Sequence, residues 1–446
     1  MKQRWKALTC LMLSVWFAAH WAWSLQKTMP GGMVDMKAVY YASRCAMEHK
    51  NPYDPNALAK VYQDSADPLP SDPKMRVVVH NVITLCVNLP TALLLMTPWA
   101  MIPWGVAHGM WFALESIGLF AAAWMVLDLA GGPKLNLALA LACLLVSNCE
   151  VFLATGNLAT VVMAASVAAV WCFETGRYEW VGILLLAVAL VLKPHDSGFV
   201  WLFLFLRGSA IRKSAVKAVF LCLALFLISV IWIAGRAPNW PDELKSNLGR
   251  TTVRGEINDP GPHSMVSKGA GMIVSLQSVA SYIRDDPGFY NSATLLICGS
   301  LLLMWLIGTV RLRDMQNPNV ALAVIIPLSL LITYHRNYDA KALLLTIPAC
   351  MQLWSEGGLR GKFAAAVNLV VLTLSGDITV TAIFDLESNV HFVASGARGT
   401  LMTLLLDRPI ALGLLVMAVF YLVIYLGWVG VRAQACSAGT EPEPAV

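Results

Sequence analysis

The chain has 446 residues, of which 58% are hydrophobic and 13% are charged, and its formal net charge at pH 7 is +5. Soluble domains carry about a quarter charged residues, so this composition excludes a soluble globular protein. The basic residues are scattered along the chain instead of forming a stripe with interleaved aromatic residues, which argues against a nucleic-acid partner. The sequence therefore predicts an all-α, polytopic membrane protein.

Apolar segments recur along the chain, and most of them are close to the roughly 20 residues that a helix needs to cross the hydrocarbon layer. The first, Ala7 to Leu25, follows a basic N-terminus and has no convincing cleavage site, so we expect an uncleaved span with a cytoplasmic N-terminus. We predict a single transmembrane helical domain over residues 1–432. Its twelve expected spans are 7–25, 104–128, 135–149, 158–173, 180–193, 197–206, 216–235, 292–310, 319–333, 340–354, 363–384 and 410–429.

The distribution of Lys and Arg predicts the orientation, because basic residues near helix ends favour the cytoplasmic side. Basic clusters occupy three short connections, at residues 207–217, 311–313 and 360–362. With these connections inside, two long loops lie on the outer face. They are residues 26–103 and 236–291.

Two segments need separate treatment. Residues 77–100 are apolar enough to cross the membrane, but they contain two Asn and two Pro, and a span there would invert every later loop. We therefore expect a juxtamembrane or partly inserted outer helix. Residues 433–446 are polar and Pro-rich, which is typical of a disordered tail, here on the cytoplasmic side.

The first outer loop begins with a carboxylate close to the membrane. Asp35 follows the glycines at 31 and 32, which let other groups approach closely, so we interpret Asp35 as a general base at the membrane surface. The alternative is that Asp35 only caps a short helix. The sequence Asn-Pro-Tyr-Asp-Pro at 51–55 predicts a turn, in which we expect a structural role for Asp54.

Two further polar clusters lie where predicted spans meet on the outer face. Glu150 and Asn157 flank one such junction, where they either face a cavity or cap helices. Lys193 and His195 lie in the sequence Lys-Pro-His-Asp between two apolar stretches. Charges at that depth need a partner or an aqueous cavity, so we interpret both residues as phosphate-binding. The alternative is that Lys193 snorkels to the interface.

A fourth cluster, at residues 334–339, lies between two spans on the same face. Arg336 can bind a phosphate through two parallel hydrogen bonds, and His335 can hydrogen-bond or protonate a leaving group. We expect Asp339 to orient this cation, with a purely structural Arg–Asp pair as the alternative.

The four clusters come from distant parts of the chain and meet on one predicted membrane face. One carboxylate base with several cations suits transfer of a group from a phosphate-bearing donor, whose leaving phosphate needs electrostatic stabilisation. We find no HExxH, P-loop, GxGxxG or Gly-x-Ser-x-Gly pattern, and the ten cysteines lack metal-ligand spacing, so we predict no metal or other cofactor. A transporter or lipid flippase is the main alternative, although transporters more often show paired repeat halves, and a non-catalytic scaffold is a third.

The order of these motifs resembles glycosyltransferase family 87 of the GT-C membrane superfamily, over most of the chain. The motifs that carry the resemblance are Asp35 after the first span, Val39-Tyr40-Tyr41, Asn51-Pro52-Tyr53-Asp54-Pro55, Gly156-Asn157, Gly176-Arg177, Leu192-Lys193-Pro194 and His335-Arg336-Asn337-Tyr338-Asp339.

The resemblance implies an inverting transfer of a hexose such as mannose from a polyprenyl-phosphate donor to a lipid or glycan acceptor. It places the active site on the outer face of a bacterial plasma membrane, with membrane lipids as partners, and the catalytic carboxylate at Asp35. The residues that we expect to bind the substrate are Asn157, Lys193, His195, His335, Arg336 and Asp339.

Overall fold

The structure is a computed structural model that describes residues 2–28, 32–65, 73–131, 135–262, 264, 273–311, 317–382 and 404–437. Within these residues the fold is all-α, as predicted. Besides helices, turns and loops, the described residues contain an isolated antiparallel β-bridge between Ile273 and Arg336.

Among the described residues, five helices are long and apolar enough to cross a membrane. They are α1 (Lys2–Thr28), α6 (Trp104–Ala130), α12 (Ser209–Ala234), α15 (Pro287–Arg311) and α21 (Pro409–Ser437). Large apolar side chains on their surfaces, such as Trp16, Phe220 and Leu296, are exposed. Extended apolar surface of this kind marks contact with a membrane, so the chain is an integral membrane protein.

Shorter helices fill the interior of the bundle. Their bounds are α7 (Leu135–Ser147), α8 (Glu150–Thr155), α9 (Ala159–Thr175), α10 (Glu179–Leu192), α11 (Pro194–Leu206), α16 (Pro318–Ile332), α17 (Ile347–Glu356) and α18 (Gly358–Leu374). Helices α9 and α16 are buried on almost every face. Each of the twelve predicted spans coincides at least in part with a described helix, while the number of membrane crossings stays a prediction.

The predicted span 340–354 differs from expectation in its first half. Residues Asp339–Thr346 form a 3-10 helix, η1, and α17 begins only at Ile347. Pro348 has no backbone N–H, so an α-helix cannot run through this position with its hydrogen bonds complete.

The apolar segment 77–100 is divided into two helices. Helix α4 (Pro73–Thr84) is separated by a short break from α5 (Pro90–Ala100), which begins at a proline. With 12 and 11 residues, each helix is too short to cross the hydrocarbon layer alone.

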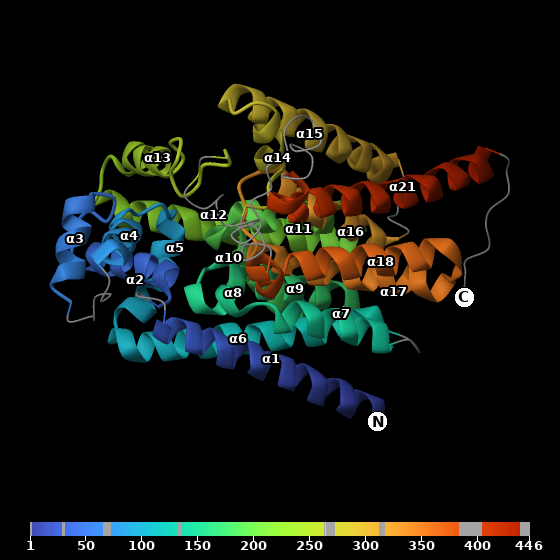
Figure 1. Cartoon of the computed structure of the whole chain (residues 1–446), viewed down its shortest axis with the longest axis horizontal. Coiled ribbons are helices and arrows are strands. Elements are labelled where there is room, and N and C mark those ends of the chain that lie inside the picture. Colours follow the sequence, from blue (N-terminus) through green and yellow to red (C-terminus); the bar gives the residue numbers. More distant parts are fainter. Residues whose placement is uncertain are drawn as a thin grey trace.

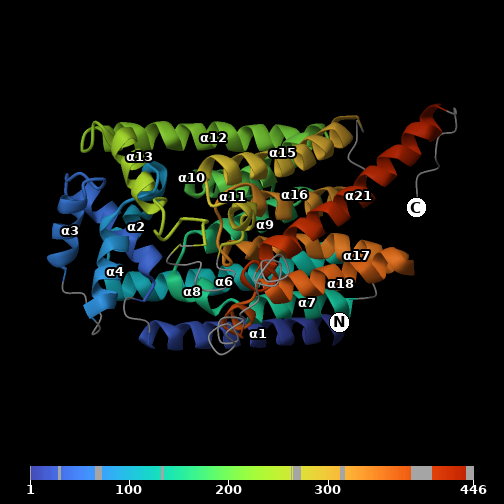
Figure 2. The ribbon, with the colours of Figure 1, turned by 45° about the horizontal axis from the view of Figure 1, so that its top comes forward.

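The first long loop and the start of the second lie at one end of the bundle. Figures 1 and 2 show α2 (Val34–Met47), α3 (Pro55–Gln63), α4, α5 and α13 (Trp240–Thr251) at this end, while α1 begins and α21 ends at the opposite one. Later in the second loop, α14 (Leu276–Ile283) packs against α15, α16 and α21 nearer the middle of the bundle (Figure 1), and the membrane face of both loops stays a prediction. Helix α21 continues to Ser437, and the rest of the predicted tail lies outside the described residues.

A buried asparagine of the second loop joins it to the first. Asn247 of α13 donates two hydrogen bonds through Nδ2, each of 3.0 Å, to the carbonyls of Tyr53 and Cys86. The turn at 51–55 is formed as predicted, and the Asp54 carboxylate caps α3 by accepting the N–H of Asn56 at 3.0 Å.

Asn247→Ala should destabilise the protein, because it leaves two buried carbonyls without their donor. Loss of such bonds costs about 1–3 kcal/mol, so the thermal midpoint of the detergent-solubilised protein should fall by several degrees. Asn81→Ala, at an exposed position of α4, is the matched control and should leave the midpoint unchanged. Equal midpoints for the two variants would contradict the role of Asn247.

Candidate active site

A close contact between the start of α2 and the end of α8 positions Asp35, the predicted base. The Met33 N–H donates to the Ala154 carbonyl at 2.8 Å, and the Asn157 amide Nδ2 donates to Asp35 Oδ2 at 2.8 Å. Asn157 Oδ1 accepts the N–H of Ala159 at 2.9 Å, which fixes the orientation of the amide. Asn157 therefore presents its donor side to the carboxylate.

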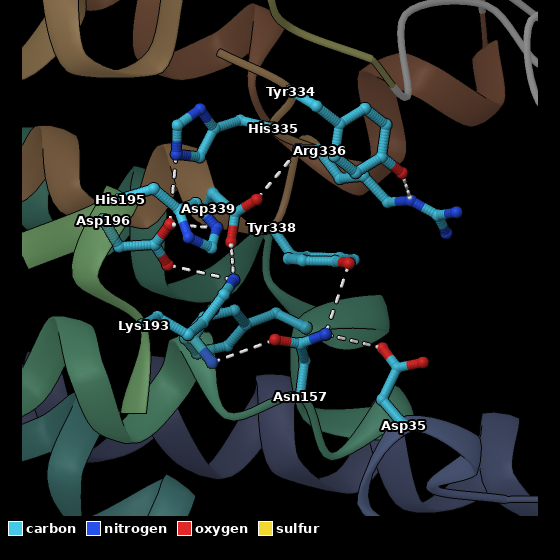
Figure 3. Close-up of polar contacts among 12 residues, drawn as sticks. Asp35, Asn157, Lys193, His195, Asp196, Tyr334, His335, Arg336, Tyr338 and Asp339 are labelled. Carbon is cyan, nitrogen blue, oxygen red and sulfur yellow. Dashed lines mark hydrogen bonds and ion pairs between the residues drawn. The ribbon is translucent and has the colours of Figure 1, made fainter. Parts of the chain in front are cut away.

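The alternative interpretation was that Asp35 caps a short helix, but Asp35 is not the cap residue. Helix α2 begins at Val34, its N-cap is Met33 in the left-handed region, and Asp35 lies in the first turn. The carboxylate is instead directed at Asn157 (Figure 3). Burial raises the pKa of Asp35 above its usual value, and the Asn157 hydrogen bond offsets part of this shift.

Gly156 makes the approach of α8 to α2 possible. It has φ of +65°, and a Cβ atom there would lie 2.9 Å from Met36 Cβ and 3.0 Å from Met33 Cβ. A side chain at this position would be both strained and in collision with α2.

Lys193 lies at the junction of α10 and α11, where Pro194 starts a new helix. Its ammonium Nζ is 2.9 Å from Asp196 Oδ2 and 3.0 Å from Asp339 Oδ1. Figure 3 shows the side chain pointing into this pair of carboxylates. The snorkelling alternative is therefore wrong. Burial alone would lower the pKa of Lys193, but the two carboxylates raise it, so the ammonium stays charged.

His335 is held between two oxygen acceptors. Its Nε2 is 3.0 Å from Asp196 Oδ1, and its Nδ1 is 3.1 Å from the Thr333 carbonyl. The Thr333 hydroxyl also lies 3.3 Å from Nδ1. An imidazolium, which donates from both ring nitrogens, fits the Asp196 carboxylate and Thr333 carbonyl acceptors. Burial opposes the charge, but the hydrogen bond and charge of Asp196 outweigh it and raise the pKa of His335.

His195 occupies the rim of the same cluster. Its half-exposed ring places Nε2 3.2 Å from Asp196 Oδ1, the same oxygen that His335 contacts. Burial, assisted by the nearby Lys193 and His335 charges, lowers the pKa of His195, so this ring is neutral near pH 7.

Arg336 is oriented by the second long loop. Its Nε donates to the Tyr334 hydroxyl, and its Nη2 donates to the Ile257 carbonyl at 3.2 Å and to Asn258 Oδ1 at 3.4 Å. Asp339 accepts the backbone N–H of Arg336 at 2.9 Å, so the expected guanidinium–carboxylate pair is not the contact that forms. Asp339 orients Lys193 instead.

Three side chains have the geometry to hold a metal ion. The ligand atoms of His195, Asp196 and His335 all lie within 4.8 Å of one another. In the structure the Lys193 ammonium and both imidazole rings contact the Asp196 carboxylate, so these side chains form a polar network with one another.

The structure brings all seven predicted site residues into one region, and it adds three that sequence reasoning did not assign. Asp196 anchors Lys193 and both histidines, and its spacing of three residues from Lys193 at a helix start could have revealed it. Tyr338 accepts a hydrogen bond from Asn157 Nδ2 at 3.2 Å, and Tyr334 binds Arg336. Both tyrosines lie in the polar cluster at 334–339, and Tyr338 belongs to a motif that carries the family resemblance, but neither was assigned a role.

A carboxylate and a group of cations thus come together inside an apolar helical bundle. The family model of glycosyltransferase family 87 matches residues 87–334, more than half of the chain, so the chain belongs to this family. Neither the curated proteins nor the solved structures contain a match. Family membership makes the chain a membrane glycosyltransferase and removes the transporter and scaffold alternatives.

Gly156→Ala should reduce glycosyltransferase activity at least tenfold, because the new Cβ pushes α8 away from α2 and separates Asn157 from Asp35. A misplacement of catalytic groups by about 1 Å can lower the rate about 100-fold. Gly176→Ala is the matched control. Gly176 has φ of +67° and also ends a helix, but no atom lies within 4 Å of its Cβ position. Steady-state rates of both variants test this, and equal losses would assign the effect to backbone strain alone.

Proposed function

We propose that the protein transfers a hexose, such as mannose, from a polyprenyl-phosphate donor to a hydroxyl of a lipid or glycan acceptor on the extracytoplasmic face. The observation that carries the proposal is the position of Asp35 opposite the cations Lys193, His335 and Arg336, with Asn157 and Tyr338 between them (Figure 3). The family supplies the reaction class, and the resemblance of the motifs suggests the donor.

Asp35 is suited to act as the general base. Asn157 holds Oδ2, and no described residue donates a hydrogen bond to Oδ1. Oδ1 is thus available to take the proton of the acceptor hydroxyl. The raised pKa of Asp35 makes its carboxylate a stronger base than that of an exposed aspartate.

The cations are suited to the leaving group. The oxygen of the acceptor forms a bond to the anomeric carbon, the bond from that carbon to the phosphate oxygen breaks, and the electron pair stays on the phosphate. The donor phosphodiester carries one negative charge, and the departing polyprenyl phosphate carries a second, which Lys193, His335 and Arg336 stabilise. Asp35 becomes neutral in the same step, so the total charge of the site is unchanged.

The base and the cations lie on different segments, with Asp35 on α2 and the cations at the junction of α10 and α11 and after α16. An acceptor that is activated at Asp35 attacks the anomeric carbon from the side opposite the phosphate, which gives inversion. The prenyl chain remains beside the apolar helices while its phosphate reaches the polar junction of α10 and α11.

Asp35→Asn should abolish transfer, since the amide keeps the shape of the side chain but cannot accept the proton. We expect the rate to fall by about 100-fold or more. Purified protein is assayed with radiolabelled polyprenyl-phosphate mannose, then with other polyprenyl-phosphate sugars, and with host lipid extract as acceptor. Undiminished activity of Asp35→Asn would remove the base assignment.

Lys193→Ala is the comparison variant in the same assay. It should weaken binding of the lipid donor about tenfold or more, because it removes a charged hydrogen-bond donor. Asp35→Asn should bind the donor nearly as well as wild type. Absence of transfer by wild type with every polyprenyl-phosphate sugar would contradict the proposed donor class.

The alkaline side of the pH–rate profile should report His335. Its imidazolium, favoured by Asp196, is lost as pH rises through the raised pKa, so kcat/KM should fall there. Asp196→Asn removes the charge that supports the imidazolium and should move this decline to lower pH. Asp128→Asn, at a distant exposed carboxylate that binds Trp171, should leave the profile unchanged. An unmoved decline in Asp196→Asn would exclude His335 as its source.

A further inference from the structure

Behind the active site lies a second buried polar cluster, which the mechanism above does not use. Its charged members are Lys341 of η1 and Asp377, which follows α18, and its amide is Asn337. They are 0%, 6% and 1% exposed, respectively. We call this group the Lys341–Asp377 clamp.

The Asp377 carboxylate joins two segments that are far apart in the sequence. Its Oδ2 accepts the N–H of Val151, in the first turn of α8, at 2.9 Å. Its Oδ1 accepts Nδ2 of Asn337 at 2.8 Å. One side chain therefore satisfies a backbone donor of α8 and a side-chain donor of the segment after α16.

Lys341 and Gly376 bring the same segments together. The Lys341 ammonium donates to the carbonyls of Asn148 and Ser375, the residues just before α8 and just before Gly376. A Cβ atom on Gly376 would lie 2.6 Å from Asn148 Cβ, so only glycine allows this approach. The Lys341 and Asp377 charges also interact with each other in an interior where isolated charges are costly.

Both segments held by Asp377 continue directly into the active site. Helix α8 leads to Gly156 and to Asn157, whose amide binds the base Asp35. Asn337 stands between Arg336 and Tyr338, in the segment that carries the cations. The clamp thus connects the base half of the site to the cation half, while Asp377 itself contacts neither Asp35 nor a cation of the site.

We propose that Asp377 is a positioning residue for glycosyl transfer, which sets the separation of Asp35 from the phosphate-binding cations through Val151 and Asn337. This inference rests on the proposed function. Alignment of base and cations matters most in the transition state, so a loosened clamp should lower kcat much more than it weakens ground-state donor binding.

The test is an exchange of the hydrogen-bonding pair. Asp377→Asn keeps the shape of the side chain, but it removes the negative charge and one of the two oxygens that accept from Val151 and Asn337. The double variant Asp377→Asn with Asn337→Asp restores an acceptor for each donor and keeps the total charge. We expect Asp377→Asn to lower kcat at least about tenfold, with the donor KM within about twofold of wild type, and the double variant to recover most of kcat.

Tyr421→Phe is the matched control, because it removes another buried hydrogen bond, to Asn368, remote from the site. It should reduce stability without changing kcat. Wild-type kcat in Asp377→Asn, or a double variant as slow as the single one, would overturn the inference. A wild-type protein that transfers no sugar would instead overturn the proposed function.

Hydrogen–deuterium exchange tests the clamp independently of turnover. Asp377→Asn should accelerate exchange in residues 149–158 and 334–340 together, and the double variant should reverse this. Tyr421→Phe should leave both segments unchanged. If Asp377→Asn left the exchange of both segments unchanged, Asp377 would not position them, whatever the activity of the protein.

Discussion

The buried ammonium group of Lys193 needs negatively charged partners, and this need determines how the active site is arranged. Lys193 interrupts the apolar sequence of α10 and α11, where an uncompensated charge would cost several kcal/mol. It is compensated by Asp196, three residues later, and by Asp339, on the segment that follows α16. The remaining oxygens of these carboxylates bind the histidines and the Arg336 backbone, so one charge requirement organises the whole cation group.

The base is held by a different principle, which is close backbone packing. Gly156 lets α8 approach α2, and the amide of Asn157 then reaches Asp35 on one side and Tyr338 on the other. Asn157 is therefore a bridge between the two halves of the site. Base and cations are thus supported on separate segments, and their alignment with the incoming acceptor and the departing phosphate governs the rate of a transfer reaction.

Much of the site could be predicted from the sequence, because a membrane restricts where polar residues can lie. Asp35, Asn157, Lys193, His335 and Arg336 are distant in sequence, yet each interrupts or borders apolar segments that end on the same predicted face. Their pairing could not be predicted. Asp339 was expected to orient Arg336 but pairs with Lys193, and Asp35 was a candidate helix cap but lies inside the first turn.

By itself the sequence determined the all-α membrane class and the positions of the apolar helices. Hydropathy and the placement of basic residues act locally along the chain, so these features can be read from composition and order. Only the tertiary structure decided the contacts of Asp196 with two histidines, the hold of the second loop on Arg336 and the junction at Asp377. Each depends on the packing of segments up to some 226 residues apart, which no local pattern records.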